Sequence, residues 1–261
     1  MCIFSGSIQR VSGTRIFVRG DGARQVLAYG MSLSVDAEVA MVLPLPVPPA
    51  PTEDAIRFVD LSGYDEMFED LARGVFPAPA ARTQSFGMAP LEVDLVVHDV
   101  GNFEASFVPT MADFDRLDPR FQLAPDVWAS LPQYADWAFA VFKLKPGAEK
   151  VHPMAFSFLR RDTTRLFFPT VHVHDGAVHD EAQFDHQLFY QPCRDVEPDP
   201  PAPPQPGVQV PFAEWTRSWR PASDFVDVAR TRGLVVGDHH VYGRAMWGDH
   251  PNRDVFVDDS A

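Results

Sequence analysis

The residues best suited to chemistry lie in the stretch 170–179, which places three histidines around an Asp-Gly pair. Asp175-Gly176 is a preferred two-residue turn, so the sequence predicts a β-hairpin in which His172 pairs with His179. Because side chains alternate between the two faces of a strand, His172, His174 and His179 would lie on one face. Opposed Cβ atoms in such pairs are about 4.5–5.5 Å apart, which lets two imidazoles share a metal ion.

Three neutral imidazoles suit Zn(II), Fe(II) or Cu, and a site with three protein ligands keeps a position open for water or substrate. The pattern therefore predicts a divalent transition metal held by these three histidines, in a metal-dependent hydrolase or oxidoreductase that acts on a small-molecule substrate. His186, which follows soon after, is the candidate general base or fourth ligand. Carboxylates that could orient the outer ring nitrogens are Asp175, Asp180 and Asp185. The same alternation also fits a hairpin whose valines face the core and whose histidines face water.

Cys2 is the second candidate for chemistry. If Met1 is removed, the mature chain begins with a thiol nucleophile whose own α-amino group, with a pKa of about 8, can serve as the base. This alternative predicts an N-terminal-nucleophile hydrolase, a class of enzyme with layered sheets and helices. Two other interpretations stay open, namely Cys2 as a soft ligand that joins the histidines and Cys2 as a buried apolar side chain.

Short strands separated by turns dominate the predicted secondary structure. The expected strands are 15–18, 25–29, 39–43, 56–59, 139–144, 154–158, 166–168 and 255–257. The run 39–43 is apolar throughout, as in a strand that is buried on both faces. Short helices are expected at 62–74, 125–131 and 223–232, where apolar residues recur at helical spacing. The predicted fold class is α+β, mainly antiparallel β-sheet with a few short helices in a single main domain.

Proline divides the chain. The 261 residues include 25 prolines, and the segment 197–211 is so rich in them that a linker or extended strap is expected. It separates a β-rich main domain, residues 1–196, from a C-terminal segment, 212–261, which is too small to carry a good core and is expected to dock on the main domain. The third functional alternative is a non-catalytic binding or scaffold protein, in which the strap and surface aromatic residues recruit a partner.

The acidic composition limits the partners. The chain has 22 Lys and Arg against 36 Asp and Glu, a net charge of −14. This charge disfavours nucleic acid and anionic membranes, because both are negatively charged. No basic region followed by a long apolar stretch begins the sequence, and the apolar runs are too short to span a bilayer. Two cysteines are few for a disulfide scaffold, so a cytoplasmic protein with reduced thiols is expected.

Several stretches resemble a poorly characterised bacterial family of unknown function with many exported members. The residues that carry the resemblance are Cys2, the proline-spaced run 41–47, the stretch 142–147 and the stretch 152–154. Family members have a leader before the cysteine, whereas here Cys2 directly follows Met1. The histidine-rich stretch is not part of the resemblance, which implies no catalytic residues.

Overall fold

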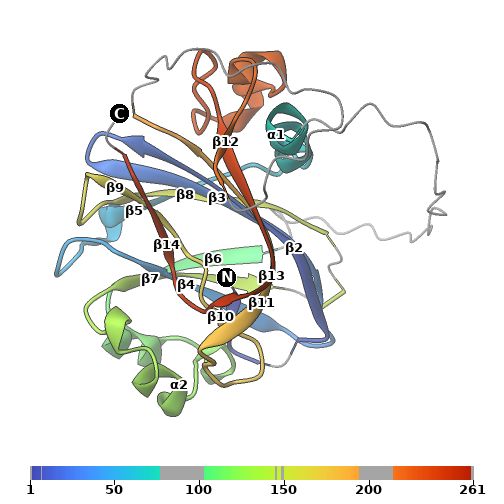
Figure 1. Cartoon of the computed structure of the whole chain (residues 1–261). Coiled ribbons are helices and arrows are strands. Elements are labelled where there is room, and N and C mark those ends of the chain that lie inside the picture. The colour runs from blue at the N-terminus through green and yellow to red at the C-terminus, as the bar shows by residue number, and fades with distance from the viewer. Residues whose placement is uncertain are drawn as a thin grey trace.

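The computed structural model describes residues 2–6, 8–76, 103–144, 146–147, 150–193 and 214–259. Over these residues the chain forms two large β-sheets with short helical segments on their outer faces (Figure 1). The larger sheet has seven strands in the order β12 (Thr216–Arg217), β13 (Tyr242–Pro251), β11 (Glu181–Gln191), β2 (Arg10–Asp21), β3 (Arg24–Ser34), β8 (Lys150–Leu159) and β5 (Ile56–Val59). The smaller sheet has five, in the order β10 (His172–Val173), β1 (Cys2–Phe4), β4 (Val39–Leu45), β7 (Ala138–Leu144) and β6 (Phe103–Val108).

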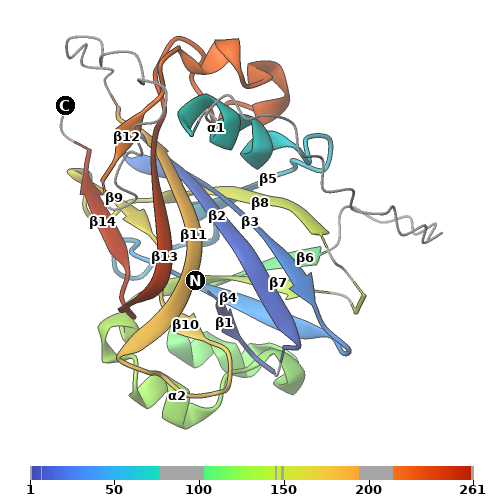
Figure 2. The same cartoon turned by 45° about the vertical axis from the view of Figure 1, so that its right-hand side comes forward.

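Most neighbouring strands are antiparallel, as Figure 2 also shows for the consecutive pair β2 and β3. The exceptions among the described pairs are β1 with β10 and β2 with β11, which are parallel. A separate two-stranded sheet joins β9 (Arg165–Phe168) to β14 (Val255–Asp258). The predicted fold class, mainly antiparallel sheet with a few short helices in one domain, is confirmed.

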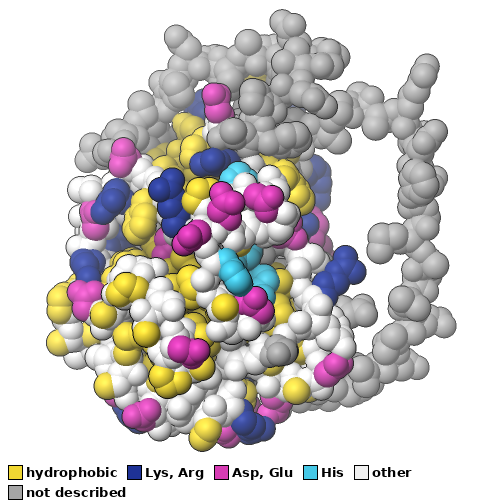
Figure 3. Space-filling view, turned by 60° about the horizontal axis from the view of Figure 1, so that its bottom comes forward, with side chains coloured by type: hydrophobic (Ala, Val, Ile, Leu, Met, Phe, Trp, Pro, Cys, Tyr) yellow, Lys and Arg dark blue, Asp and Glu magenta, His cyan; other side chains and the backbone are white. Residues whose placement is uncertain are grey.

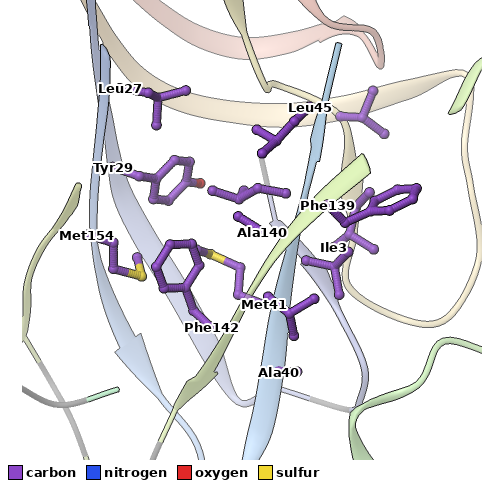
Figure 4. Packing of buried hydrophobic residues seen from close by; sticks show 14 of the residues in the cluster. Ile3, Leu27, Tyr29, Ala40, Met41, Leu45, Phe139, Ala140, Phe142 and Met154 are labelled. Carbon is purple, nitrogen blue, oxygen red and sulfur yellow. The ribbon is translucent and has the colours of Figure 1, made fainter. Parts of the chain in front are cut away.

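The main core lies between the two large sheets. From the larger sheet, Ile16 and Val18 of β2 and Leu27 and Tyr29 of β3 belong to it, while the alternate residues of these strands face the other way. From the smaller sheet, Met41 of β4 lies against this layer (Figure 4). Every residue of β4 is buried, as expected for an apolar run without alternation.

Helical segments cover the outer faces of both sheets. Helix α1 (Met67–Val75) packs its apolar side on the larger sheet, together with the 3₁₀ turns η5 (Ala222–Asp224) and η6 (Val228–Thr231). The smaller sheet is covered by η2 (Met111–Arg116), η3 (Pro119–Phe121), α2 (Pro125–Ala129) and η4 (Pro132–Tyr134). A further 3₁₀ turn, η1 (Glu53–Ala55), precedes β5. No helix in the described part of the chain is both long and apolar enough to cross a bilayer.

The C-terminal segment is built into the sheets. It supplies β12 and β13 to the larger sheet and β14 to the small one. The helix expected over 223–232 is replaced by the two turns η5 and η6, because the Asp227 carboxylate accepts the N–H of Arg230 and starts a new turn. The proline-rich strap, 197–211, lies outside the described residues.

A glycine sets how closely helix α1 approaches the η5 turn. A Cβ atom built on Gly74 would lie 2.2 Å from the Phe225 ring, whereas one on Gly63 would meet nothing within 4 Å. Helix propensity alone predicts that Gly74→Ala stabilises the protein by about 1 kcal/mol. We expect the opposite, a loss of about 1–3 kcal/mol in the free energy of unfolding, because the ring must be displaced.

Urea unfolding of Gly74→Ala and of the matched control Gly63→Ala measures this difference. The control should stay within about 0.5 kcal/mol of the wild type. A more stable Gly74→Ala variant would show that the helix and the turn are not held in contact.

Candidate functional site

The stretch 170–179 does not form the predicted hairpin. His172 and Val173 form β10, which pairs in parallel with Cys2 and Ile3 of β1. The Asp175 carboxylate accepts the N–H of Ala177 at 3.1 Å and contacts the His179 ring at 2.9 Å. Asp175 thus closes a local turn of its own, and the partner of β10 is the N-terminal strand rather than residues 177–179.

The histidines are therefore divided between two environments. The ring centroids of His172 and His174 lie 4.9 Å apart, whereas the side chain of His179 is 62% exposed and pairs with Asp175. Within the described ranges no group of three or more His, Cys, Asp or Glu side chains could hold a metal ion. The interpretation of the chain as a metal-binding protein or metalloenzyme is wrong.

His172 and His186 instead form a buried histidine pair. His186 of β11 has no exposed surface and His172 is 8% exposed, and their Nε2 atoms are 3.1 Å apart. The backbone N–H of Asp185 donates to His186 Nδ1 at 3.3 Å, which assigns the ring proton of His186 to Nε2. His186 is then the donor to Nε2 of His172, and both rings are neutral.

Aromatic rings surround the buried histidine pair. Phe184 lies 4.6 Å from the His172 ring and 4.7 Å from the His186 ring, between centroids. His250 meets Phe184 edge-on at 5.4 Å, and His174 lies 6.0 Å from Phe4. Seen from this end of the molecule, histidine side chains gather near the middle of the face with acidic side chains beside them (Figure 3).

Burial fixes the charge of these rings. Desolvation lowers the pKa of His172 to about 2 and that of His174 to about 4. The same cause lowers the pKa of His186 well below its usual value, and the neighbouring histidines lower it further. Carboxylates of Asp175 and Asp185 act in the opposite sense on His174 without outweighing burial. The pair is therefore a neutral polar contact inside the core.

Asn252, which the sequence analysis did not single out, fastens β10 from its other side. Its side-chain oxygen accepts the N–H of His172 at 2.7 Å, and its amide nitrogen donates to the carbonyls of His172 and His179, each at 2.9 Å. One side chain thus completes the backbone hydrogen bonds of a sheet edge, as a neighbouring strand would. The only signal in the sequence is the turn-like stretch 248–252.

Next to Asn252, Asp254 links three segments. Its carboxylate accepts the Thr170 N–H at 2.8 Å and the Tyr134 hydroxyl at 2.6 Å. Burial raises the pKa of Asp254 to about 6, although both hydrogen bonds act to lower it. Desolvation and the nearby carboxylate also raise the pKa of Tyr134, so Tyr134 is the donor in this pair.

The backbone of Cys2 lies beside that of His172 in the β1–β10 ladder. Its side chain is outside the described residues, so the roles proposed for it as a nucleophile or ligand stay predictions. The general-base role of His186 also stays a prediction. The ring of His186 has no exposed surface.

The sequence matches no protein-family model and no curated protein. The fold does have known counterparts. It is similar to a crystal structure of baculovirus P35, with a TM-score of 0.52 and 12% identity over 98% of this chain and 99% of that one. It is also similar to a mutated baculovirus P35 solved after caspase cleavage, with a TM-score of 0.50 and 12% identity over 95% and 99% of the two chains. The resemblance to a bacterial family is not tested by these similarities.

The buried histidine pair makes stability depend on pH. Unfolded histidines bind protons with a pKa of about 6.5, but the folded pair binds them only at much lower pH. Below pH 6.5 the unfolded state therefore takes up more protons, and the free energy of unfolding falls. Each histidine of the pair contributes a loss of about 2 kcal/mol between pH 6.5 and 5. Asp254 has the opposite effect: its pKa is raised in the folded state, so its protonation increases the free energy of unfolding as the pH falls through that pKa.

His186→Phe removes one of these groups, so its loss of stability between pH 7.5 and 5 should be about 2 kcal/mol smaller than that of the wild type. Urea unfolding followed by tryptophan fluorescence at the two pH values measures it. The exposed His179, changed to Phe, is the control and should keep the pH dependence of the wild type. An unchanged dependence in His186→Phe would contradict the assignment.

Asn252→Ala removes three hydrogen bonds, two to the backbone of His172 in β10 and one to the carbonyl of His179. We expect the free energy of unfolding to fall by about 2–3 kcal/mol, because buried backbone groups of His172 lose their partners. Asn252→Asp can still accept from His172 but cannot donate, so its loss should also exceed about 1 kcal/mol. Hydrogen exchange provides the local measurement: the His172 amide should exchange faster in Asn252→Ala and stay protected in Asn252→Asp. Unchanged exchange in both variants would mean that Asn252 does not hold this strand.

Proposed function

We propose that this protein is a non-catalytic binding protein whose partner is a caspase. The observation that carries the proposal is the likeness of fold to baculovirus P35, which extends over nearly the whole of both chains. One of the similar P35 structures was solved after caspase cleavage, so that protein is a caspase target. The sequence predicted a small-molecule substrate, and the partner proposed here is a protein instead.

The connection between α1 and β6 suits contact with a protease. Helix α1 ends at Val75 and β6 begins at Phe103. Loops longer than about 12–15 residues are uncommon in compact domains and are usually either functional segments or linkers. The segment 77–102 contains the sequence Leu-Glu-Val-Asp at 91–94, and caspases cut the chain after aspartate.

Both ends of this connection are fixed to the body. At the first end, Val75 and Phe76 pack against Gly243 so closely that a Cβ on the glycine would meet Val75 at 2.6 Å. The Phe76 ring also lies 5.7 Å from Phe189. At the second end, Phe103 pairs with Leu144 in the smaller sheet. A cut within 77–102 would therefore leave two chain ends that are each held by a folded element.

The experiment mixes the purified protein with active caspases and follows hydrolysis of a fluorogenic aspartyl peptide. We expect peptide hydrolysis to fall as the protein is added, together with one cut in the protein after Asp94, located by mass spectrometry. Asp94→Ala should abolish both effects without a change in melting temperature. Asp99→Ala, in the same segment, is the matched control and should behave as the wild type.

Two results would overturn the proposal. Caspase activity that is unaffected by micromolar concentrations of the protein would show that caspases are not its partner. Cutting without any loss of caspase activity would make the protein an ordinary substrate rather than a binding protein.

A further inference from the structure

A preformed pocket lies where the β8–β9 connection meets β14, and neither member of the buried histidine pair lines it. Its volume is about 120 Å³. Four aromatic side chains form much of its wall, namely Trp137, Phe158, Phe167 and Phe256. An apolar cavity of about 150 Å³ binds benzene. This pocket is somewhat smaller, so a single aromatic ring would fill it and the polar end of the ligand would reach the mouth.

The aromatic walls are held in place. The Gln25 side chain donates to the carbonyl of Phe167 at 2.7 Å and accepts its N–H at 2.9 Å. The Phe167 ring lies 5.3 Å from Trp137 and 5.4 Å from Phe256, between centroids. A ligand would therefore enter a site that needs little reordering, which lowers the entropic cost of binding.

Three arginines also line the pocket, in a chain with a net charge of −14. Two of them are occupied by the protein. Arg160 forms a buried ion pair with Asp259 at 2.5 Å. Arg161 binds both the carboxylate and the carbonyl of Asp136.

Arg165 has donors to spare at the solvent-exposed mouth of the pocket, whereas the one Arg160 donor without a partner, Nε, is buried. Its Nε binds the Asp162 carboxylate at 2.8 Å, and in the described part of the structure its two Nη groups have no hydrogen-bond partner. The side chain is 50% exposed, and its guanidinium lies 4.9 Å from the centre of the Phe256 ring. A carboxylate can accept two parallel hydrogen bonds from a guanidinium.

We propose that this pocket binds a one-ring aromatic carboxylate, with its ring against the aromatic wall and its carboxylate on Arg165. The ring would bury apolar surface against Phe167 and Phe256, and the carboxylate would stay at the solvent-exposed mouth where its desolvation is small. This site does not depend on the proposed caspase partner, since it shares no residue with the 77–102 connection.

Benzoate is the probe, and the indole N–H resonance of Trp137, identified with Trp137→Phe, is the readout in a titration followed by NMR. We expect saturable shifts with a dissociation constant of about 1 mM. Benzamide, which has the ring without the charge, and acetate, which has the charge without the ring, should each bind at least about tenfold more weakly.

Arg165→Met should weaken benzoate binding at least about tenfold. Arg116→Met is the matched control, because Arg116 also pairs with an aspartate three residues away, Asp113, but does not line the pocket. Phe256→Ala, at a half-exposed position, should weaken benzoate binding as well, with urea unfolding used to verify that each variant is folded. Benzoate that fails to saturate, benzamide that binds equally well, or an Arg165→Met variant that binds like the wild type would each overturn the proposal.

Discussion

Burial of β4 on both faces is the constraint on which the rest of the structure depends. A strand with no exposed residue needs a layer on each side, and the chain supplies the seven-stranded sheet on one side and the helical segments 111–134 on the other. Phe139 of the neighbouring strand β7 illustrates the outer layer, since its ring lies 5.1 Å from Phe114 and 5.0 Å from Trp128. Within its own sheet, β4 also gives β1 and β7 their positions.

The buried histidine pair joins these layers with a polar contact. His172 belongs to the smaller sheet and His186 to the larger one, so their hydrogen bond crosses the interior between sheets. A polar group in the core is tolerated only when it is hydrogen-bonded, and here the Nε2 atoms of the two rings are each other's partners. With β1 on one side and Asn252 on the other, β10 is fixed although it has only two residues.

The sequence predicted those strands and helices whose apolar pattern is complete within a few consecutive residues. The apolar run 39–43 became β4, and the helical spacing of Met67, Phe68 and Leu71 became α1. The central strand β11 was missed, because glutamine, aspartate and histidine interrupt its apolar residues. His186 is buried only by partners that lie far away in the sequence. The strand predicted over 39–43 was too short: β4 continues through Pro44 to Leu45. Pro44 is tolerated there because β1 pairs only with Met41 and Val42.

The candidate site was only partly predictable for the same reason. Sequence alternation placed His172 and His174 together correctly, but spacing alone could not show that β1 would displace residues 177–179 as the partner. It also could not show that His186 would meet His172 from another sheet. For Asn252 the turn-like stretch 248–252 was the only signal, because the role of this residue depends on a strand edge formed by residues much earlier in the chain.

The two parallel strand pairs govern the order in which the chain can fold. The first strand pairs with residues 172–173, and β2 pairs with residues 187–191, so neither ladder can close during synthesis until most of the polypeptide has left the ribosome. Closing such distant pairs requires a large loss of chain entropy before any contact repays it, which makes folding slow. Until then one edge of β1 and one edge of β2 have no partner and are open to aggregation. With this topology, rapid synthesis of the last third of the chain, or a chaperone that shields the first strands, would reduce aggregation during folding.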